Sequence, residues 1–238
     1  QADNRAILAA GAFPLNVITA VTLQTPAGVE AVECMSASFV VNQLRRLLEA
    51  YPVAAVKSGM LASKAIAESL AKILEDFPEI PYVLDPVLIS SSGHTLLPPS
   101  AVALLRDRLM PRATVTTPNL DELFTLAHTA AGTDPIEVGL ELAKACGQSV
   151  LMKGGHSKSD ACDDWLLGPA GTQELFTSER VKSENLRGTG CALSSAIAAR
   201  LAYGDPLSTA VKWAKAMLSD SLKKNVVMTW TGFGPAML

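Results

Sequence analysis

The chain has 238 residues, of which 49% are hydrophobic and 18% are charged, and its formal net charge is −3. This length and apolar fraction support a sizeable core in one large domain or two small ones, and they exclude an intrinsically disordered chain. The near-neutral charge gives no basic surface for nucleic acid, and no apolar run reaches the roughly 18–20 residues that would span a bilayer.

The chain opens with Gln1-Ala2-Asp3, without an initiator methionine or a signal peptide. Residues 2–10 favour a helix, and Gly11 is a natural stop for it. An enzyme rarely begins inside a helix, so we expect a native N-terminal segment to precede this sequence.

Strands and helices alternate after this first helix. Apolar residues at helical spacing predict helices, and short β-branched or apolar runs predict strands. In chain order the predicted elements are a strand at 16–22, a helix at 37–50, a strand at 54–57, a helix at 62–75, a strand at 82–86, a helix at 99–109, a strand at 113–116, helices at 120–128 and 135–146, a strand at 149–153, strands near 162–167 and 174–178, and helices at 189–203 and 206–223. Strands separated by helices of this length indicate βαβ units, so we expect one α/β domain over residues 1–238 with a mainly parallel central sheet.

Polar or conformationally special residues follow several predicted strands. In an α/β sheet, ligands bind outside the carboxyl ends of the strands. Any one of these residues could be a turn or a helix cap, but the whole set predicts a binding site at this edge. The set is Gln24, Lys57-Ser58-Gly59-Met60, Asp85-Pro86-Val87, Thr117-Pro118-Asn119 and Lys153-Gly154-Gly155-His156.

Gly188, Thr189 and Gly190 stand directly before a long helix rich in alanine and leucine. The first turn of a helix offers amide N–H groups and a partial positive charge, and glycines let an anionic oxygen approach the backbone. The string therefore predicts an anion hole suited to a phosphoryl group in transfer. The alternative is an N-cap at Thr189 with glycines for close packing. The string matches neither a P-loop nor GxGxxG.

The four cysteines (Cys34, Cys146, Cys162 and Cys191) lie far apart and form no CxxC pair. This spacing argues against a zinc site and a disulfide scaffold, and it favours a reducing, cytoplasmic location. Cys191 lies in the first turn of the helix, where the pKa of a thiol falls, so we expect a partial thiolate near neutral pH that can act as base or nucleophile. The alternative is a small buried hydrophobic residue, which is the interpretation for the other three.

Taken in order, the segments QAD, VITAVTLQ, KSGML, VLDPVL, TTPNLDEL, VLMKGGH, DDWL and RGTGCALSSAIAA resemble the ribokinase superfamily. Within it they resemble the bacterial hydroxymethylpyrimidine/phosphomethylpyrimidine kinases of thiamine biosynthesis, along essentially the whole chain. The resemblance implies a ribokinase-like fold with helices on both faces of the sheet. It also implies transfer of the γ-phosphoryl group of ATP to 4-amino-5-hydroxymethyl-2-methylpyrimidine and then to its monophosphate, with Mg²⁺ as cofactor and a homodimer as the assembly.

The same resemblance implies roles for the residues at matching positions. The positions that match pyrimidine-binding residues are Asp3, Gln24, Met60, Val87 and Cys191. Magnesium is assigned to Asp85 and Glu122, and the ATP phosphates are assigned to Asn119, Lys153 and Thr189. The transferred phosphoryl group is assigned to Gly188, Thr189 and Gly190, with Cys191 as the base.

The chain departs from the family pattern in three places. A first strand and a glycine-rich GSDxSGGAGI segment, which the family has before QAD, are missing from this sequence. Arg187 stands where the family usually has His, and Ala192 where it usually has Thr. Arg187 is either a phosphate contact or a solvated loop residue. His156 follows the Gly-Gly turn, and we assign it no role in nucleotide binding.

Two alternatives to a pyrimidine kinase stay open. A pyridoxal kinase with the same cysteine motif acts on a ring with a similar hydroxymethyl arm, so the fold cannot separate the two. A non-catalytic pyrimidine sensor is disfavoured by Asp85, Glu122 and Lys153, because a sensor has no need of the magnesium acids.

Overall fold

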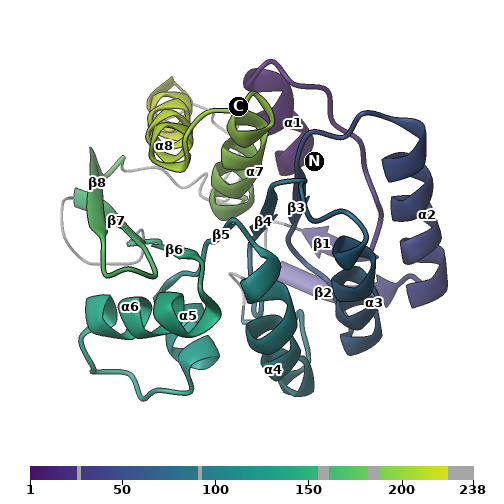
Figure 1. Cartoon of the computed structure of the whole chain (residues 1–238), viewed down its shortest axis with the longest axis horizontal. Helices are drawn as coiled ribbons and strands as arrows, with labels where there is room; N and C mark the ends of the chain where they lie inside the picture. Colours follow the sequence, from purple (N-terminus) through teal and green to yellow (C-terminus); the bar gives the residue numbers. More distant parts are fainter. Residues whose placement is uncertain (26–27, 91–92, 155–160, 182–187, 225–238) are drawn as a thin grey trace.

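The structure is a computed structural model, and it describes residues 1–25, 28–90, 93–154, 161–181 and 188–224. Within these ranges six strands form a central sheet in the order β3-β4-β5-β6-β7-β8 (Figure 1). The first four pair in parallel and the last two pair antiparallel: β3 (Val56–Ser58), β4 (Tyr82–Leu84), β5 (Val115–Thr116), β6 (Ser149–Met152), β7 (Ala161–Leu167) and β8 (Gln173–Glu179). The mainly parallel sheet confirms the predicted fold class.

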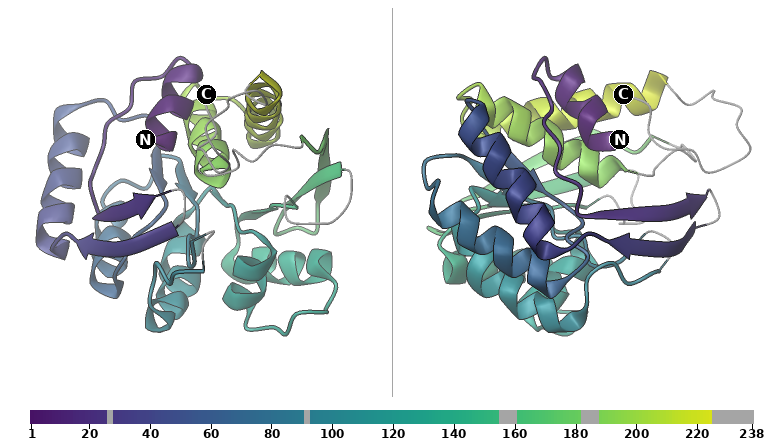
Figure 2. Two further views of the ribbon diagram at one scale, coloured as in Figure 1. Left: turned by 180° about the vertical axis from the view of Figure 1, so that it is seen from behind. Right: turned by 90° about the vertical axis from the view of Figure 1, so that its right-hand side faces the viewer.

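Helices cover both faces of the sheet (Figures 1 and 2). One face carries α1 (Ala2–Ala9), α7 (Thr189–Ala202) and α8 (Leu207–Lys224). The other face carries α2 (Ala37–Ala50), α3 (Lys64–Glu75), α4 (Val102–Leu104), α5 (Leu120–Ala127) and α6 (Pro135–Cys146). Every helix in the described ranges is too short or too polar to cross a membrane.

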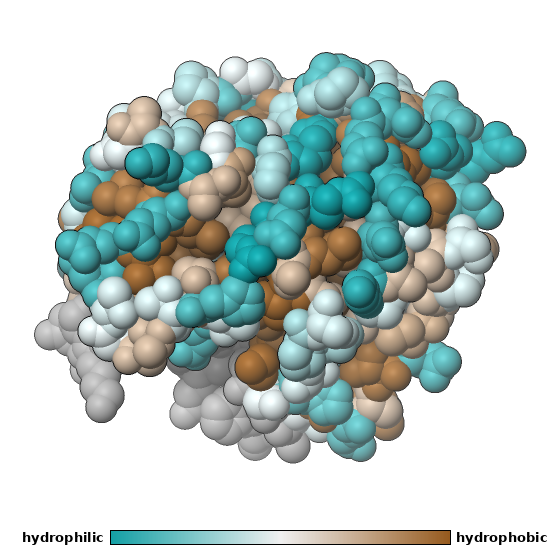
Figure 3. All heavy atoms as spheres, turned by 60° about the horizontal axis from the view of Figure 1, so that its bottom comes forward, coloured by the Kyte–Doolittle hydropathy of each residue, from teal (hydrophilic) through white to brown (hydrophobic). Residues whose placement is uncertain are grey.

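The alternation of side chains along the strands divides the core into two layers. Successive residues of a strand point to opposite faces of its sheet. Val83, Val115 and Leu151 pack against α7 and α8, whereas Tyr82 and Leu84 pack on the side of α3. Seen from below the view of Figure 1, the surface mixes hydrophilic and apolar side chains (Figure 3).

The N-terminal region differs from the prediction of a strand at 16–22. Residues 12–19 have no regular structure, and strand β1 (Ala20–Thr25) pairs antiparallel with β2 (Gly28–Cys34), which was not predicted. The two form a separate sheet that is not hydrogen-bonded to the central one (Figure 2). Val21 and Leu23 are 56% and 59% exposed, so their apolar side chains imitate the pattern of a buried strand without being buried.

The helices largely match the prediction, and their ends have local chemical causes. The side chains of Ser36 and Ser63 accept hydrogen bonds from the amides of Phe39 and Ile66, which caps α2 and α3. The exception is the predicted helix at 99–109, which is irregular. There α4 lies between a 3₁₀ turn at Pro99–Ala101 and a π turn at Leu105–Leu109, with a further 3₁₀ turn at Met110–Arg112.

Candidate active site

Asp85 follows β4 at the carboxyl edge of the parallel strands, and its hydrogen bonds connect β4 with β5, β6 and α7. It is 1% exposed. Its Oδ1 accepts hydrogen bonds from Lys153 Nζ at 2.9 Å and Thr117 Oγ1 at 3.2 Å, and its Oδ2 accepts one from Ser194 Oγ of α7 at 3.2 Å. Burial alone would raise the pKa of Asp85, but Lys153, Lys57 and these hydrogen bonds lower it below its usual range. Asp85 is therefore a carboxylate at neutral pH.

Glu122 is the second acid of the site, and it is fixed by the start of α5. Asn119 Oδ1 accepts a hydrogen bond from the Glu122 amide at 2.9 Å, and Glu122 Oε2 accepts one from the Asn119 amide at 2.8 Å. This capping box places Glu122 Oε2 4.0 Å from Lys153 Nζ. Burial raises the pKa of Glu122 to about 7. The negative charge of Asp85 adds to this rise, and the positive charge of Lys153 offsets it only in part. Glu122 therefore titrates near neutral pH, unlike Asp85.

The start of α7 lies against Lys153. A Cβ on Gly190 would lie 3.2 Å from Lys153 Nζ, so the ammonium group faces the first turn of the helix. Gly188, which precedes the helix, has φ +77, a conformation that favours glycine. The first amides of a helix have no acceptor within the helix. The structure therefore brings the predicted anion hole of Gly188, Thr189 and Gly190 together with Lys153 and Asp85.

The prediction of a partial thiolate at Cys191 is wrong. Burial raises the pKa of Cys191 to about 11, and Asp85 and Asp3 add to this rise, while the ammonium groups of Lys57 and Lys153 offset it only in part. The N-terminus of α7 favours a thiolate, but the loss of hydration around the sulfur outweighs that effect. The Cys191 thiol therefore keeps its proton at neutral pH.

Lys57 is a functional candidate to which the sequence pattern gives no role of its own. Its side chain is 8% exposed, and its Nζ donates to Asp3 Oδ1 at 2.8 Å. Ser195 Oγ donates to the same oxygen at 2.7 Å, so Asp3 connects α1 with β3 and α7. Burial alone would lower the pKa of Lys57, but Cys191, Asp3 and Asp85 raise it above its usual range. Lys57 is therefore an ammonium ion. Its position at the end of β3 places it in the set of strand-end residues that predicts a binding site, but that set gives it no particular role.

Met60 and Val87, the predicted apolar walls of the pyrimidine pocket, lie near Lys57. A Cβ on Gly59 would lie 2.8 Å from Lys57 Nζ and 3.9 Å from Val87 Cγ2, so these two side chains flank Gly59. The next residue, Met60, accepts a hydrogen bond at its carbonyl from Thr19 Oγ1 at 2.7 Å. The structure thus brings Val87 to Lys57 and, through Lys57, to Asp3.

Gln24 is a predicted pyrimidine residue that no hydrogen bond or ion pair in the described ranges connects to this cluster. It is exposed on β1, opposite Val29 of β2. Its predicted place at the carboxyl end of a central strand is wrong, because β1 belongs to the separate two-stranded sheet. A role for Gln24 in pyrimidine binding stays a prediction. Arg187 and His156 lie outside the described residues.

Asp85 and Glu122 could hold a magnesium ion together with a nucleotide. In the described ranges no three His, Cys, Asp or Glu side chains gather as a metal site. The two acids nevertheless converge on Lys153 Nζ, at 2.9 and 4.0 Å. Magnesium is commonly held by one or two carboxylates and completes its shell with water and substrate phosphates. The oxygen donors present fit an ion of that kind.

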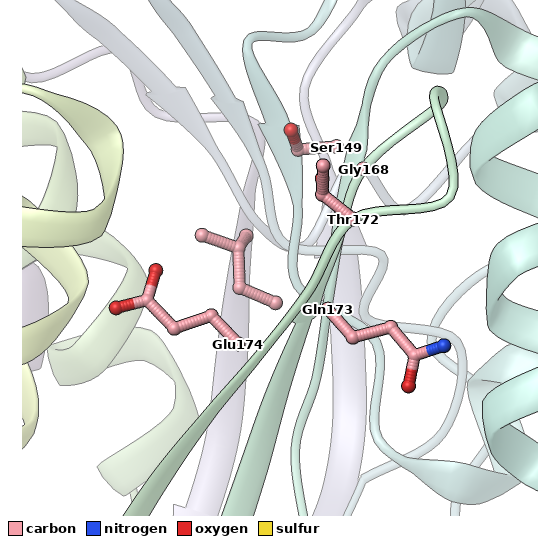
Figure 4. Close-up of a pocket in the computed structure, with 6 residues that line it drawn as sticks. Ser149, Gly168, Thr172, Gln173 and Glu174 are labelled. Atoms are coloured by element: carbon pink, nitrogen blue, oxygen red, sulfur yellow. The ribbon is translucent and has the colours of Figure 1, made fainter.

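A pocket of about 300 Å³ lies elsewhere, beside the turn between β7 and β8 (Figure 4). Ser149 begins β6, so the pocket is at the opposite end of that strand from Lys153. The one acid in its lining, Glu174, accepts a hydrogen bond from Ser208 Oγ at 2.7 Å. No cationic side chain lines the pocket, so it lacks the charge that a phosphate ligand requires. The lining residues are Ser149, Leu166, Gly168, Thr172, Gln173 and Glu174.

Known proteins resemble this chain over nearly its whole length. The family described as phosphomethylpyrimidine kinase matches residues 1–237. The hydroxymethylpyrimidine/phosphomethylpyrimidine kinase of Escherichia coli K12 is 38% identical over 240 residues, which cover 99% of this chain and 90% of that protein. The crystal structure of a phosphomethylpyrimidine kinase from Clostridium difficile 630 has a TM-score of 0.80 and 34% identity, and the match covers 93% of this chain and 91% of that one. An ADP complex of Bacillus subtilis pyridoxal kinase has a TM-score of 0.88 and 26% identity, with 99% and 91% covered.

Proposed function

Because the chain belongs to the phosphomethylpyrimidine kinase family, we propose that it phosphorylates 4-amino-5-hydroxymethyl-2-methylpyrimidine and then the resulting monophosphate, with ATP as donor, in thiamine biosynthesis. One observation carries the proposal beyond the family match. Two buried acids, Asp85 and Glu122, meet Lys153 and the first turn of α7 at the carboxyl ends of the parallel strands. Phosphoryl transfer is mostly positioning and charge stabilisation, and this cluster is built for both.

The first transfer exchanges one bond to phosphorus for another. The hydroxymethyl oxygen of the pyrimidine bonds to the γ-phosphorus, the bond from that phosphorus to the β,γ-bridging oxygen breaks, and ADP leaves. The first amides of α7 and the ammonium of Lys153 are proposed to stabilise the oxygens of the transferred phosphoryl group. Asn119, which caps α5 beside Lys153, is proposed to lie near the ATP phosphates.

Magnesium would be held by Asp85 and Glu122, and when bound it supplies positive charge that offsets the triphosphate of ATP. The hydroxyl proton must also leave during the first transfer. Cys191 is the proposed acceptor, although a pKa of about 11 leaves only about one thiol in 10⁴ ionised at pH 7. Lys57 and Lys153 are the groups that favour its thiolate. The base role therefore requires a lower pKa when the substrates are bound.

The pyrimidine would lie among Asp3, Met60 and Val87. Met60 and Val87 supply apolar contacts to the ring, and Asp3 is anchored beside them by Lys57 and Ser195. Gln24 carries both an amide donor and an acceptor, which suits the edge of an aminopyrimidine.

The role of Asp85 is tested by a magnesium titration at fixed ATP. Asp85→Asn should need a higher magnesium concentration for half-maximal turnover than the parent. Asp121→Asn is the matched control, because Asp121 is an exposed acid in the first turn of the same helix as Glu122, and its titration should follow the parent. If the Asp85→Asn and parent titrations coincide, Asp85 is structural.

A pyridoxal kinase is the second candidate, and the TM-score of 0.88 with a Bacillus subtilis pyridoxal kinase favours it. The higher identity to pyrimidine kinases favours the first. The ratio of kcat/KM for the hydroxymethylpyrimidine to kcat/KM for pyridoxal separates them. We expect a ratio well above one, and a ratio below one would make pyridoxal the preferred substrate.

We further propose that residues 1–238 form one catalytic domain, that the protein is cytoplasmic and that it is a homodimer. All four cysteines are free thiols in the structure, which suits a reducing compartment.

The proposed homodimer rests on the two-stranded sheet of β1 and β2. Two paired strands with exposed Val21 and Leu23 are marginally stable alone, which favours a second copy of the chain packed against them. Sedimentation equilibrium tests the assembly, since a monomer mass at micromolar concentration would exclude the dimer.

A further inference from the structure

The site holds two ammonium groups that are only slightly exposed, and they differ in their ion-pair partners. Lys153 Nζ lies 2.9 Å from Asp85 and 4.0 Å from Glu122, so two acids share its charge. Lys57 Nζ has an ion pair with one acid, Asp3, at 2.8 Å, and Asp3 is 42% exposed and also accepts from Ser195. Lys57 therefore has fewer ion-pair partners than Lys153.

Lys57 also stands on the pyrimidine side of the site. Its Nζ lies over Gly59 next to Val87, and it is close enough to Cys191 at the start of α7 to favour the ionised form of that thiol. In the described part of the chain, Nζ donates one hydrogen bond, to Asp3, whereas an ammonium group has three N–H donors. Two donors are thus left for a ligand that enters between Asp3, Val87 and Cys191.

The two proposed substrates differ in the charge that they bring to this place. The hydroxymethylpyrimidine brings a neutral hydroxyl, whereas its monophosphate brings a charge of about −1.5 to −2 at pH 7. A buried phosphate is costly unless a cation and hydrogen-bond donors meet it. Lys153 and the amides of α7 are proposed to serve the ATP phosphates and the transferred group, so the phosphate of the acceptor needs a cation of its own.

We propose that Lys57 binds the phosphate of the monophosphate substrate and thereby supports the second transfer more than the first. The inference rests on the proposed two-step function and adds a specificity-determining residue to it. In the second transfer a phosphate oxygen of the monophosphate bonds to the γ-phosphorus, the bond to the β,γ-bridging oxygen breaks, and ADP leaves. Lys57 remains protonated and transfers no proton.

Asp3 and the substrate phosphate then share the ammonium group of Lys57, and the carboxylate of Asp3 repels the phosphate. Removing the ammonium of Lys57 should therefore lower kcat/KM for the second transfer, and removing the carboxylate of Asp3 should raise it. The informative quantity is the ratio of kcat/KM for the purified monophosphate to kcat/KM for the alcohol, because a general loss of activity cancels in this ratio.

The experiment measures that ratio, with ATP and magnesium saturating, for the parent, Lys57→Met and Asp3→Asn. Methionine has a similar length and no charge. We expect Lys57→Met to lower the ratio roughly 10- to 100-fold, as for a lost hydrogen bond to a charged group, and Asp3→Asn to raise it. Lys64→Met, which removes an exposed lysine at the start of α3, is the matched control and should leave the ratio unchanged. Calorimetric binding of the monophosphate without ATP should weaken in Lys57→Met only.

Each result decides the proposal. A ratio in Lys57→Met equal to that of the parent overturns it, even where both rate constants fall. If Lys57→Met does not fold, Asp3→Asn carries the test, and a ratio that is unchanged or lowered there overturns the proposal. A parent protein that makes no diphosphate from purified monophosphate contradicts the two-step function itself, which is a separate outcome.

Discussion

Replacing Lys215 by methionine should lower the stability of the protein far more than replacing an exposed lysine of the same helix. Lys215 Nζ on α8 donates to Asp164 Oδ2 on β7 at 2.6 Å, and both side chains are 9% exposed. The other oxygen of Asp164 accepts from the Gly154 amide at 2.9 Å. Lys215→Met therefore leaves a buried carboxylate without its cation. Breaking one side of a buried ion pair costs about 3–5 kcal/mol.

The control is Lys223→Met near the end of α8. Lys223 pairs with Glu179 at 3.4 Å, but the two side chains are 51% and 85% exposed, and an exposed pair contributes about 0–1 kcal/mol. For a domain of this size, about 3–5 kcal/mol corresponds to a fall in Tm of roughly 6–20 °C. The double variant Lys215→Met, Asp164→Leu should regain part of the loss, because it removes both buried charges.

Urea unfolding followed by circular dichroism gives the free energy of unfolding for each variant. The KM for ATP should also rise in Lys215→Met, because Asp164 holds the amide of Gly154, the residue after Lys153. Equal losses of stability in Lys215→Met and Lys223→Met would refute the reasoning, since the buried pair would then contribute no more than the exposed one.

Three further results are expected. The pKa of Glu122 rises from about 4.5 to about 7 on folding, so between these values the folded protein holds a proton that the unfolded chain has released. Glu122 then contributes stability of the order of 3 kcal/mol that is complete below about pH 4.5 and is lost as the pH rises through 7. Glu122→Gln should flatten urea-measured stability between pH 5 and 7 in the presence of a chelator, and an unchanged slope would contradict the shift. The rate of Cys191 alkylation, followed by peptide mass spectrometry, should rise about tenfold per pH unit between pH 8 and 10. A rate that reaches its plateau near pH 7 would show instead that Cys191 is a thiolate at neutral pH. Gln24→Leu should raise the KM for the pyrimidine much more than the KM for ATP, and equal increases would place Gln24 in the scaffold.

The elements that could be predicted best are those whose ends carry their own chemistry. Helix α6 spans Pro135–Cys146 as predicted, because Asp134 caps its first turn, proline suits its first position and Gly147 ends it at φ +70. The β1–β2 hairpin could not be placed in this way. Its strands pair with each other rather than with the central sheet. Val21 and Leu23 are apolar residue types typical of a buried strand, so the sequence does not indicate that they are exposed in a separate sheet.

The candidate site also has residues that could be predicted from the sequence and contacts that could not. Asp85 and Lys153 were predictable because each follows a buried strand of a parallel sheet. The bonds of Asp3 were not, because Lys57 lies 54 positions away and Ser195 lies 192 positions away. They depend on how α1 packs against α7. The protonated state of Cys191 was missed for a related reason, since its burial is a property of the whole fold.

The most direct test of the two-step kinase is a time course of products by mass spectrometry, with the parent protein, magnesium, ATP and the hydroxymethylpyrimidine. The two-step proposal predicts that the monophosphate appears first and is then converted to the diphosphate, with two ADP released for each diphosphate formed. A reaction that stops at the monophosphate, or that phosphorylates pyridoxal in preference when both compounds are present, would contradict it.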